Sequence, residues 1–171
     1  MTLIVKATAN DCHILATIGK TTLIESHGNS APEEDINSYV NENFTPKVFE
    51  KELRDEKNIY YLIYYNNQPV GYSKIILNTP NKNIDVDNVA MLERIYVLKE
   101  FYGLRLGYEL LKFNMGLSKP NNQHGIWLNV WVENKKAINF YKKVGFKIIG
   151  SYEFRVSETH SNPNHQLFLK L

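Results

Sequence analysis

The spacing of apolar residues changes several times along the chain, and each change predicts a new element of secondary structure. Apolar residues at helical spacing and capping signals predict helices over residues 11–27, 104–118 and 134–144, with two short helices between residues 30 and 56. Runs that alternate, or that are rich in β-branched and aromatic residues, predict strands. These strands cover residues 3–6, 59–65, 69–77, 89–98, 126–132, 146–154 and 165–171.

Local signals and element order then suggest how the chain is organised. Ser30, with Glu33 three residues later, resembles a capping box, and Thr45 followed by Pro46 predicts a second helix start. The predicted strand-helix-strand units imply parallel neighbours, whereas the hairpins imply antiparallel ones. We therefore expect a single α/β domain over residues 1–171, with a mixed sheet of about seven strands and about four helices covering both faces.

Composition and charge narrow the class of protein. A chain of 171 residues that is 43% hydrophobic is long enough to bury one core. A net charge of +2 without a block of like charges argues against a nucleic-acid binder that depends on phosphate contacts. The single cysteine, Cys12, fits a reducing compartment. The N-terminal residues lack a signal-peptide pattern, and no apolar run approaches the roughly 20 residues of a membrane span. We expect a soluble cytoplasmic protein with no membrane partner.

Two charged residues interrupt an otherwise apolar predicted strand. By simple alternation Glu93 shares a face with Ile95 and Val97, and Arg94 lies on the opposite face with Tyr96. One interpretation is that both charges find structural partners elsewhere in the fold. The other is that Glu93 is a partly desolvated carboxylate suited to act as a base.

The predicted start of the helix over 104–118 contains Gly103, Arg105 and Gly107. Free N–H groups and the helix dipole at such a start favour an anion, and an arginine there could pair with a phosphate. The glycine spacing fits neither the Walker loop nor the dinucleotide fingerprint, which argues against a dinucleotide-binding oxidoreductase. An ordinary tight loop with a solvated arginine explains the same residues equally well.

The segment from residue 134 to residue 146 has clear helix signals. Asn134 predicts the N-cap, and Gly145 followed by Phe146 predicts a left-handed end with a hydrophobic contact. Tyr141 falls on the apolar stripe of this helix. By pattern alone, its role is core packing.

Taken together, these segments resemble the GCN5-related N-acetyltransferase superfamily. Its pattern Asn-x-x-Ala-x-x-Phe-Tyr-x-x-x-Gly-Phe is complete here in Asn134, Ala137, Phe140, Tyr141, Gly145 and Phe146. Its phosphate loop, Gln/Arg-x-x-Gly-x-Gly/Ala, is matched only at Gly107, because Tyr102 and Arg105 replace the other two positions. The clear resemblance covers residues 89–150. Within the superfamily, residues 92–97 and 126–131, together with the segment Asn-Phe-Tyr-Lys-Lys at 139–143, are similar to PaiA-type spermine/spermidine acetyltransferases.

The resemblance implies a splayed sheet, acetyl-CoA as co-substrate, no metal, and direct attack of an amine on the thioester. The residues that it implies for coenzyme binding are Ile95, Tyr96, Val97, Tyr102, Gly103, Leu104, Arg105, Leu106, Gly107, Asn134, Tyr141 and Lys143. The implied catalytic residues are Glu93 as base and Tyr141 as the acid that protonates the thiolate. The arginine at position 105 puts the phosphate geometry and the coenzyme affinity in question.

The acceptor is implied to be a primary amine. Acidic Glu33, Glu34 and Asp35 lie in the segment that borders the acceptor cleft in this family, and they could attract a polyamine such as spermidine or spermine. The alternative is a solvated helix start, where the dipole favours acids. Other acceptors left open are a protein or peptide amine and a small amine. A non-catalytic acyl-CoA-binding regulatory protein and a homodimer also remain open.

Overall fold

The computed structural model describes residues 1–171 and contains seven strands and five α-helices. The strands are β1 (Thr2–Lys6), β2 (Ile59–Tyr65), β3 (Gln68–Ile76), β4 (Ala90–Val97), β5 (Gly125–Trp131), β6 (Lys147–Arg155) and β7 (Ser161–Lys170). The helices are α1 (Cys12–His27), α2 (Glu33–Asn43), α3 (Pro46–Arg54), α4 (Leu106–Ser118) and α5 (Lys135–Val144). The expected mixed α/β fold is confirmed, and its five helices correspond to the five helical segments predicted one by one, although the expected total was about four.

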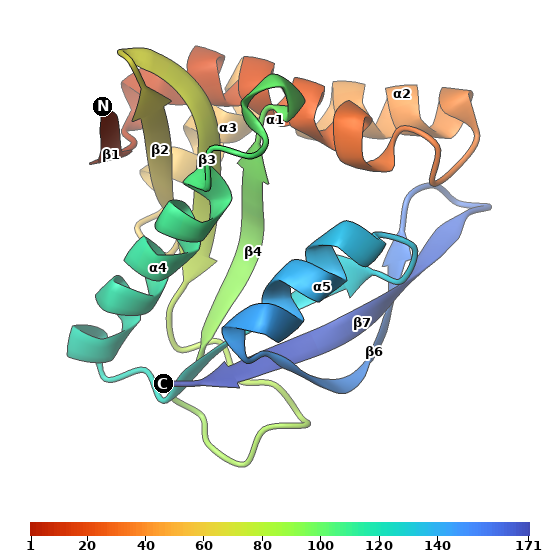
Figure 1. Cartoon of the computed structure of the whole chain (residues 1–171). Coiled ribbons are helices and arrows are strands. Elements are labelled where there is room, and N and C mark those ends of the chain that lie inside the picture. Colours follow the sequence, from red (N-terminus) through yellow and green to blue (C-terminus); the bar gives the residue numbers. More distant parts are fainter.

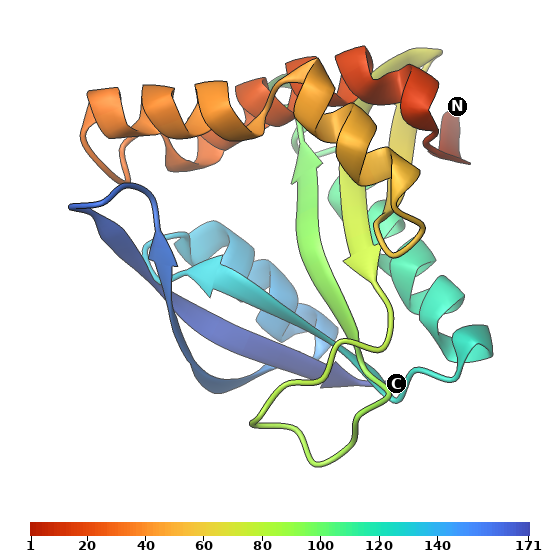
Figure 2. The ribbon, with the colours of Figure 1, turned by 180° about the vertical axis from the view of Figure 1, so that it is seen from behind.

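All seven strands form one sheet in the order β1-β2-β3-β4-β5-β7-β6. Every neighbouring pair is antiparallel except β4 and β5, which are joined by α4 and run parallel. Helices α1, α2 and α3 lie on one face and across one end of the sheet, and α4 and α5 cover the other face (Figures 1 and 2). The two faces of the sheet are therefore covered by different helices.

Three apolar clusters hold these layers together. One packs α1, α2 and α3 against β2, β3 and β4, a second packs α4 and α5 against β4, β5 and β7, and a third packs α4 against β2 and β3. The centre of the first cluster is aromatic: the Phe49 ring lies edge-on to both Tyr60 and Tyr72, with centroid distances of 5.8 and 6.3 Å. Such pairs add specific geometry to the burial of apolar surface. No helix is long and apolar enough to cross a membrane.

Several predicted helix ends are confirmed. The Thr45 hydroxyl accepts a hydrogen bond from the Val48 N–H, with Pro46 at the first helical position. Helix α5 ends at Gly145, whose φ of 115° lies in the left-handed region, and Gly145 and Phe146 donate back to carbonyls of the last turn. Glycine lowers the conformational free-energy cost of this helix end, because a residue with a Cβ is strained at that φ.

Other local predictions were wrong. Ser30 does not cap α2, since the residue before the helix is Pro32 and Ser30 Oγ instead accepts from the Asn162 amide at 2.8 Å. Helix α4 begins at Leu106 rather than Leu104, because Arg105 before it has left-handed backbone angles. Strand β7 begins four residues earlier than expected, at residue 161, because its partner β6 extends the hairpin.

Candidate active site

The site lies where β4 and β5 separate. Their ladder consists of Ala90 with Ile126 and Met91 with Trp127, and the strands diverge beyond these pairs. In Figures 1 and 2 the two strands meet at one end of the sheet and spread apart toward α1 and α2. The backbone edges that face each other past this point have no strand partner. A cavity of about 1080 Å³ is lined by both strands and by residues of α1, α2, α4 and α5.

One end of the cavity is formed by the N-terminus of α4. The N–H groups of residues 103–108 donate to no backbone or side-chain acceptor of the chain. Gly103, with φ 89°, and Arg105, with φ 60° and ψ 12°, both have left-handed backbone angles in this segment. A run of unpaired N–H groups at a helix start is a typical binding site for phosphate. The first glycine of the family's loop pattern is replaced here by Arg105, which adopts a conformation typical of glycine.

Basic side chains surround this end of the cavity. The lining includes Arg105, Lys112, Lys136 and Lys143. The Lys136 ammonium lies 4.2 Å from the centroid of the Tyr102 ring. Several cations beside a phosphate-binding helix start are complementary to an anion with several phosphate groups.

Almost all of the predicted coenzyme residues line this cavity. They are Ile95, Tyr96, Val97, Tyr102, Gly103, Arg105, Leu106, Gly107, Asn134, Tyr141 and Lys143. Leu104 does not line it, and its side chain is exposed. The side-chain oxygen of Asn134 accepts from the Ala137 N–H at 3.2 Å, so this residue also caps α5 as predicted.

Tyr141 lies on α5 with its ring between Phe140 and Phe146, at centroid distances of 5.2 and 5.4 Å. The residue is 7% exposed, it lines the cavity, and no group of the chain accepts a proton from its hydroxyl. Burial, with a smaller effect of Tyr96, raises the pKa of Tyr141 above its ordinary value. The phenol is therefore protonated at neutral pH and can donate a proton to a group in the cavity.

Glu93 occupies a β-bulge, which corrects the expected alternation of β4. Lys74 of β3 pairs with Arg94, and the next residue, Ile75, pairs with Leu92, so Glu93 has no cross-strand partner. A bulge residue shifts the following side chains to the opposite face. The predicted arrangement, with Glu93 and Arg94 on opposite faces, was therefore wrong. Both side chains point to the face covered by α3.

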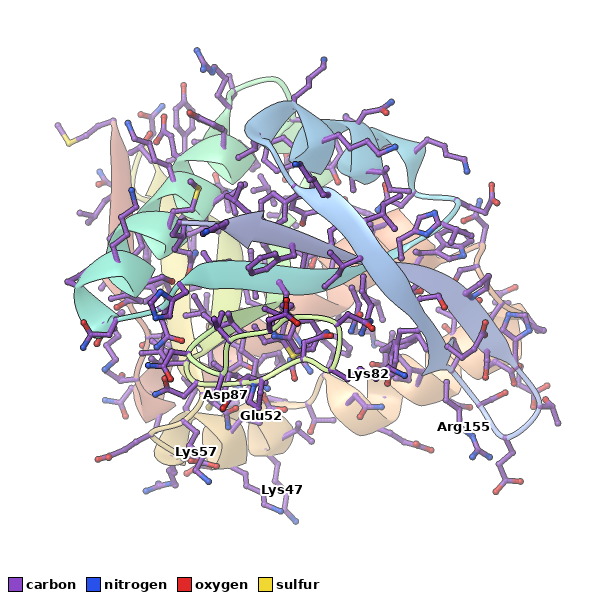
Figure 3. The ribbon with its side chains drawn as sticks, turned by 90° about the horizontal axis from the view of Figure 1, so that it is seen from below. Lys47, Glu52, Lys57, Lys82, Asp87 and Arg155 are labelled. Carbon is purple, nitrogen blue, oxygen red and sulfur yellow. The ribbon has the colours of Figure 1, made fainter.

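The charges on this face form one compact group. Lys74 is buried between two carboxylates, with its ammonium 3.0 Å from Glu52 and 2.5 Å from Glu93. Arg94 donates to the Tyr60 hydroxyl at 3.1 Å, and Tyr60 donates to Glu52. Glu52 points inward from α3, whereas Lys47 on the same helix points outward (Figure 3). Burial raises the pKa of Glu52, but Arg94, the Tyr60 hydroxyl and Lys74 outweigh it and hold that pKa below its usual value.

A histidine that the sequence did not single out also reaches the gap. Ser26 Oγ lies 2.7 Å from the Thr22 carbonyl and 2.6 Å from Nδ1 of His27. Because the carbonyl only accepts, Ser26 donates to it and accepts from a protonated Nδ1, which leaves a lone pair on Nε2. Burial lowers the pKa of His27 to about 4. The ring lies against Tyr96 of β4 and Trp131 of β5, so a neutral acceptor faces the point where these strands part.

The family model "Acetyltransferase (GNAT) family" matches residues 23–146, more than half of the chain. The chain belongs to this family. The predicted class, an N-acetyltransferase, is thereby confirmed.

Individual relatives agree with the family assignment. An uncharacterized N-acetyltransferase of Lactobacillus delbrueckii subsp. lactis is 24% identical over 152 residues, which cover 88% of this chain and 87% of the relative. A probable spermine N(1)-acetyltransferase of Bacillus subtilis subsp. natto is 26% identical over 107 residues, covering 60% and 70%. The structure of PaiA N-acetyltransferase from Thermoplasma acidophilum in complex with coenzyme A superposes with a TM-score of 0.78, at 18% identity and 100% and 99% coverage. The last similarity shows a common fold.

Proposed function

We propose that this protein transfers the acetyl group of acetyl-CoA to a primary amine in the gap between β4 and β5. The observation that carries the proposal is a cavity that joins a helix start with unpaired N–H groups to the unpaired strand edges. Its two ends suit different reactants. The end at α4 is basic and rich in free N–H groups, and the end under α1 and α2 is lined by aromatic rings and a compensated set of charges.

Different residues of the chain would bind different parts of acetyl-CoA. The free N–H groups of residues 103–108 would hold the pyrophosphate, with Arg105 and the nearby lysines adding charge. The unpaired edge of β4 at Ile95, Tyr96 and Val97 would bond to the amides of the pantetheine arm, as a neighbouring strand does. This placement brings the thioester to the centre of the gap, between the two ends of the cavity.

In the chemical step the amine nitrogen attacks the thioester carbonyl carbon and the C–S bond then breaks. A backbone N–H near Ile95 stabilises the oxyanion that forms. The amine must first lose a proton, and an ammonium with a pKa of ~10.4 makes this cost about 4–5 kcal/mol at pH 7. Glu93 accepts that proton, directly or through water, and Tyr141 donates one to the departing thiolate.

Which primary amine serves as the acceptor is a separate question. The Bacillus relative named for spermine is the observation that favours a polyamine. The acidic residues expected to attract a polyamine are Glu33, Glu34 and Asp35, which form the first turn of α2 and do not line the cavity. Asp35 instead accepts a hydrogen bond from Ser157 Oγ at 3.1 Å. Their position is the one that the helix dipole favours for acids.

Thiol release from acetyl-CoA in the presence of a panel of primary amines, with mass spectrometry of the products, tests the proposal. Tyr141→Phe should lower kcat by about 10²–10³-fold while the Kd for coenzyme A changes by less than about threefold. Tyr65→Phe, a change on β2 outside the cavity, is the matched control and should leave both values unchanged. Coenzyme binding without turnover of any amine would instead support the non-catalytic acyl-CoA-binding alternative.

A further inference from the structure

The end of the cavity under α1 and α2, which we term the acceptor pocket, has a composition that bears on the substrate. Its side chains include His27, Tyr39, Phe44, Tyr96, Tyr152 and Phe154. We infer that the acceptor is a primary amine whose body is apolar and aromatic, and not a polycation. This inference rests on the proposed function and specifies the substrate class of the same site.

The charges of the cavity leave no anionic partner for a second ammonium group. Glu52 and Glu93 are the carboxylates that line it. Both lie within 3.0 Å of the buried Lys74 ammonium, and Arg94 lies within 4.0 Å of each. Two carboxylates are thus compensated by two cations. A substrate with an extra ammonium would desolvate it without forming an ion pair, which is costly.

The wall of the acceptor pocket is instead aromatic. Tyr39 of α2 lies 6.1 Å from Phe44 and 5.6 Å from Phe154 of β6, measured between ring centroids, and the second pair is edge-on. Helix α2 extends over the hairpin end of β6 and β7 (Figure 1), and its Tyr39 lines the pocket there together with Phe154. Tyr152, two residues before Phe154 on β6, also lines it and is 45% exposed. A flat ring can pack edge-on or offset against such a wall.

Two uncharged polar residues, His27 and Asn129, also line the cavity. His27 Nδ1 contacts Ser26 Oγ at 2.6 Å, which leaves Nε2 as the ring nitrogen with no hydrogen-bond partner in the chain. Asn129 of β5 also lines the cavity, and its side-chain oxygen has no hydrogen-bond partner. Both can accept a hydrogen bond from an amine N–H. One amine nitrogen can therefore be held at the gap while the rest of the molecule lies against the rings.

Four amines separate the contributions of ring and charge: phenethylamine, pentylamine, 1,5-diaminopentane and spermidine. Pentylamine and 1,5-diaminopentane differ only in the second amino group. We expect kcat/KM to fall in the order given, with phenethylamine about 100-fold above 1,5-diaminopentane. If spermidine or 1,5-diaminopentane is the best acceptor, the inference is wrong although the proposed function stands. If kcat/KM for pentylamine equals that for phenethylamine, the inference that the acceptor body is aromatic is wrong.

A charge introduced into the wall tests the same reasoning from the protein side. Tyr152→Glu adds an uncompensated carboxylate at a partly exposed position of the pocket, so the fold should tolerate it. We expect the preference for phenethylamine over 1,5-diaminopentane to fall at least tenfold. Ile148→Glu is the matched control, because Ile148 is 45% exposed on the same strand and does not line the cavity.

The outcomes of these measurements are distinct. An unchanged preference in Tyr152→Glu, or an equal change in Ile148→Glu, would show that the wall does not contact the acceptor body and would overturn the inference. No acetylation of any of the four amines, together with no binding of coenzyme A, would overturn the proposed function and the inference with it.

Discussion

Replacement of Arg105 tests both the backbone and the charge of the phosphate loop. At φ 60° and ψ 12° the residue before α4 has left-handed backbone angles, and the Arg105 guanidinium lies 5.4 Å from the centroid of the Tyr108 ring. Arg105→Gly and Arg105→Ala both remove the guanidinium. They differ in backbone strain, because glycine adopts this conformation freely and alanine does not.

The expected difference in stability between the two variants follows from two opposing free-energy terms. A residue with a Cβ pays roughly 1–2 kcal/mol in the left-handed region, and glycine loses about 0.4–1 kcal/mol more backbone entropy on folding. Arg105→Gly should therefore be more stable than Arg105→Ala by about 0.5–1 kcal/mol in urea unfolding. In both variants the Kd for coenzyme A should rise about tenfold at low salt, as expected for a lost charge-assisted contact.

The two measurements refute different parts of this reasoning. Equal stabilities of the glycine and alanine variants would show that the left-handed angles at Arg105 carry no strain. An unchanged Kd in both variants would show that the guanidinium does not contact the phosphates. A Kd that rises only in the alanine variant would assign the effect to the backbone alone.

Three further predictions address the acceptor side and the fold. His27 has a folded pKa of about 4, below its unfolded value of ~6.5, so its neutral form stabilises the fold above pH 6.5 and this contribution is lost as pH falls toward 4. From pH 7 to pH 5 the loss is about 2 kcal/mol, and urea unfolding of His27→Gln should lack it; the same pH dependence in both proteins would contradict this. Glu93→Gln should lower kcat/KM for the amine about 10²-fold, whereas Glu153→Gln on exposed β6 should not, and equal rates would exclude Glu93 as the base. Thr45→Ala should cost about 1 kcal/mol in unfolding, because the Val48 N–H loses its acceptor, and no loss would contradict the cap.

The parts of the fold that could be predicted from the sequence depend on neighbouring residues. Thr45 with Pro46, and Gly145 with Phe146, set helix ends through contacts within a few residues. The pattern ending in Phe146 also identified the family, and with it Tyr141 in the cavity. Such signals survive in the sequence because their partners are close along the chain.

The predictions that failed involve partners that are distant in the sequence. Ser30 matches a capping box, but its hydroxyl accepts from Asn162, 132 residues away. The bulge at Glu93 depends on the register with β3, which alternation within one strand cannot reveal.

Lys74 and His27, both in the site, were missed for the same reason. Lys74 gave a weak signal, as a lysine within an apolar strand, but its partners lie on α3 and β4. His27 gave none, because its tautomer and its burial depend on Ser26 and on two aromatic rings from other strands.

A crystal structure with bound acetyl-CoA would test the central claim most directly. The account predicts pyrophosphate oxygens within hydrogen-bond distance of the N–H groups of residues 103–108, and the pantetheine arm between β4 and β5 along Ile95–Val97. The thioester sulfur should lie near the Tyr141 hydroxyl, with its carbonyl carbon open to the acceptor pocket. A coenzyme bound outside the β4–β5 gap, or with its phosphates away from the start of α4, would contradict the account.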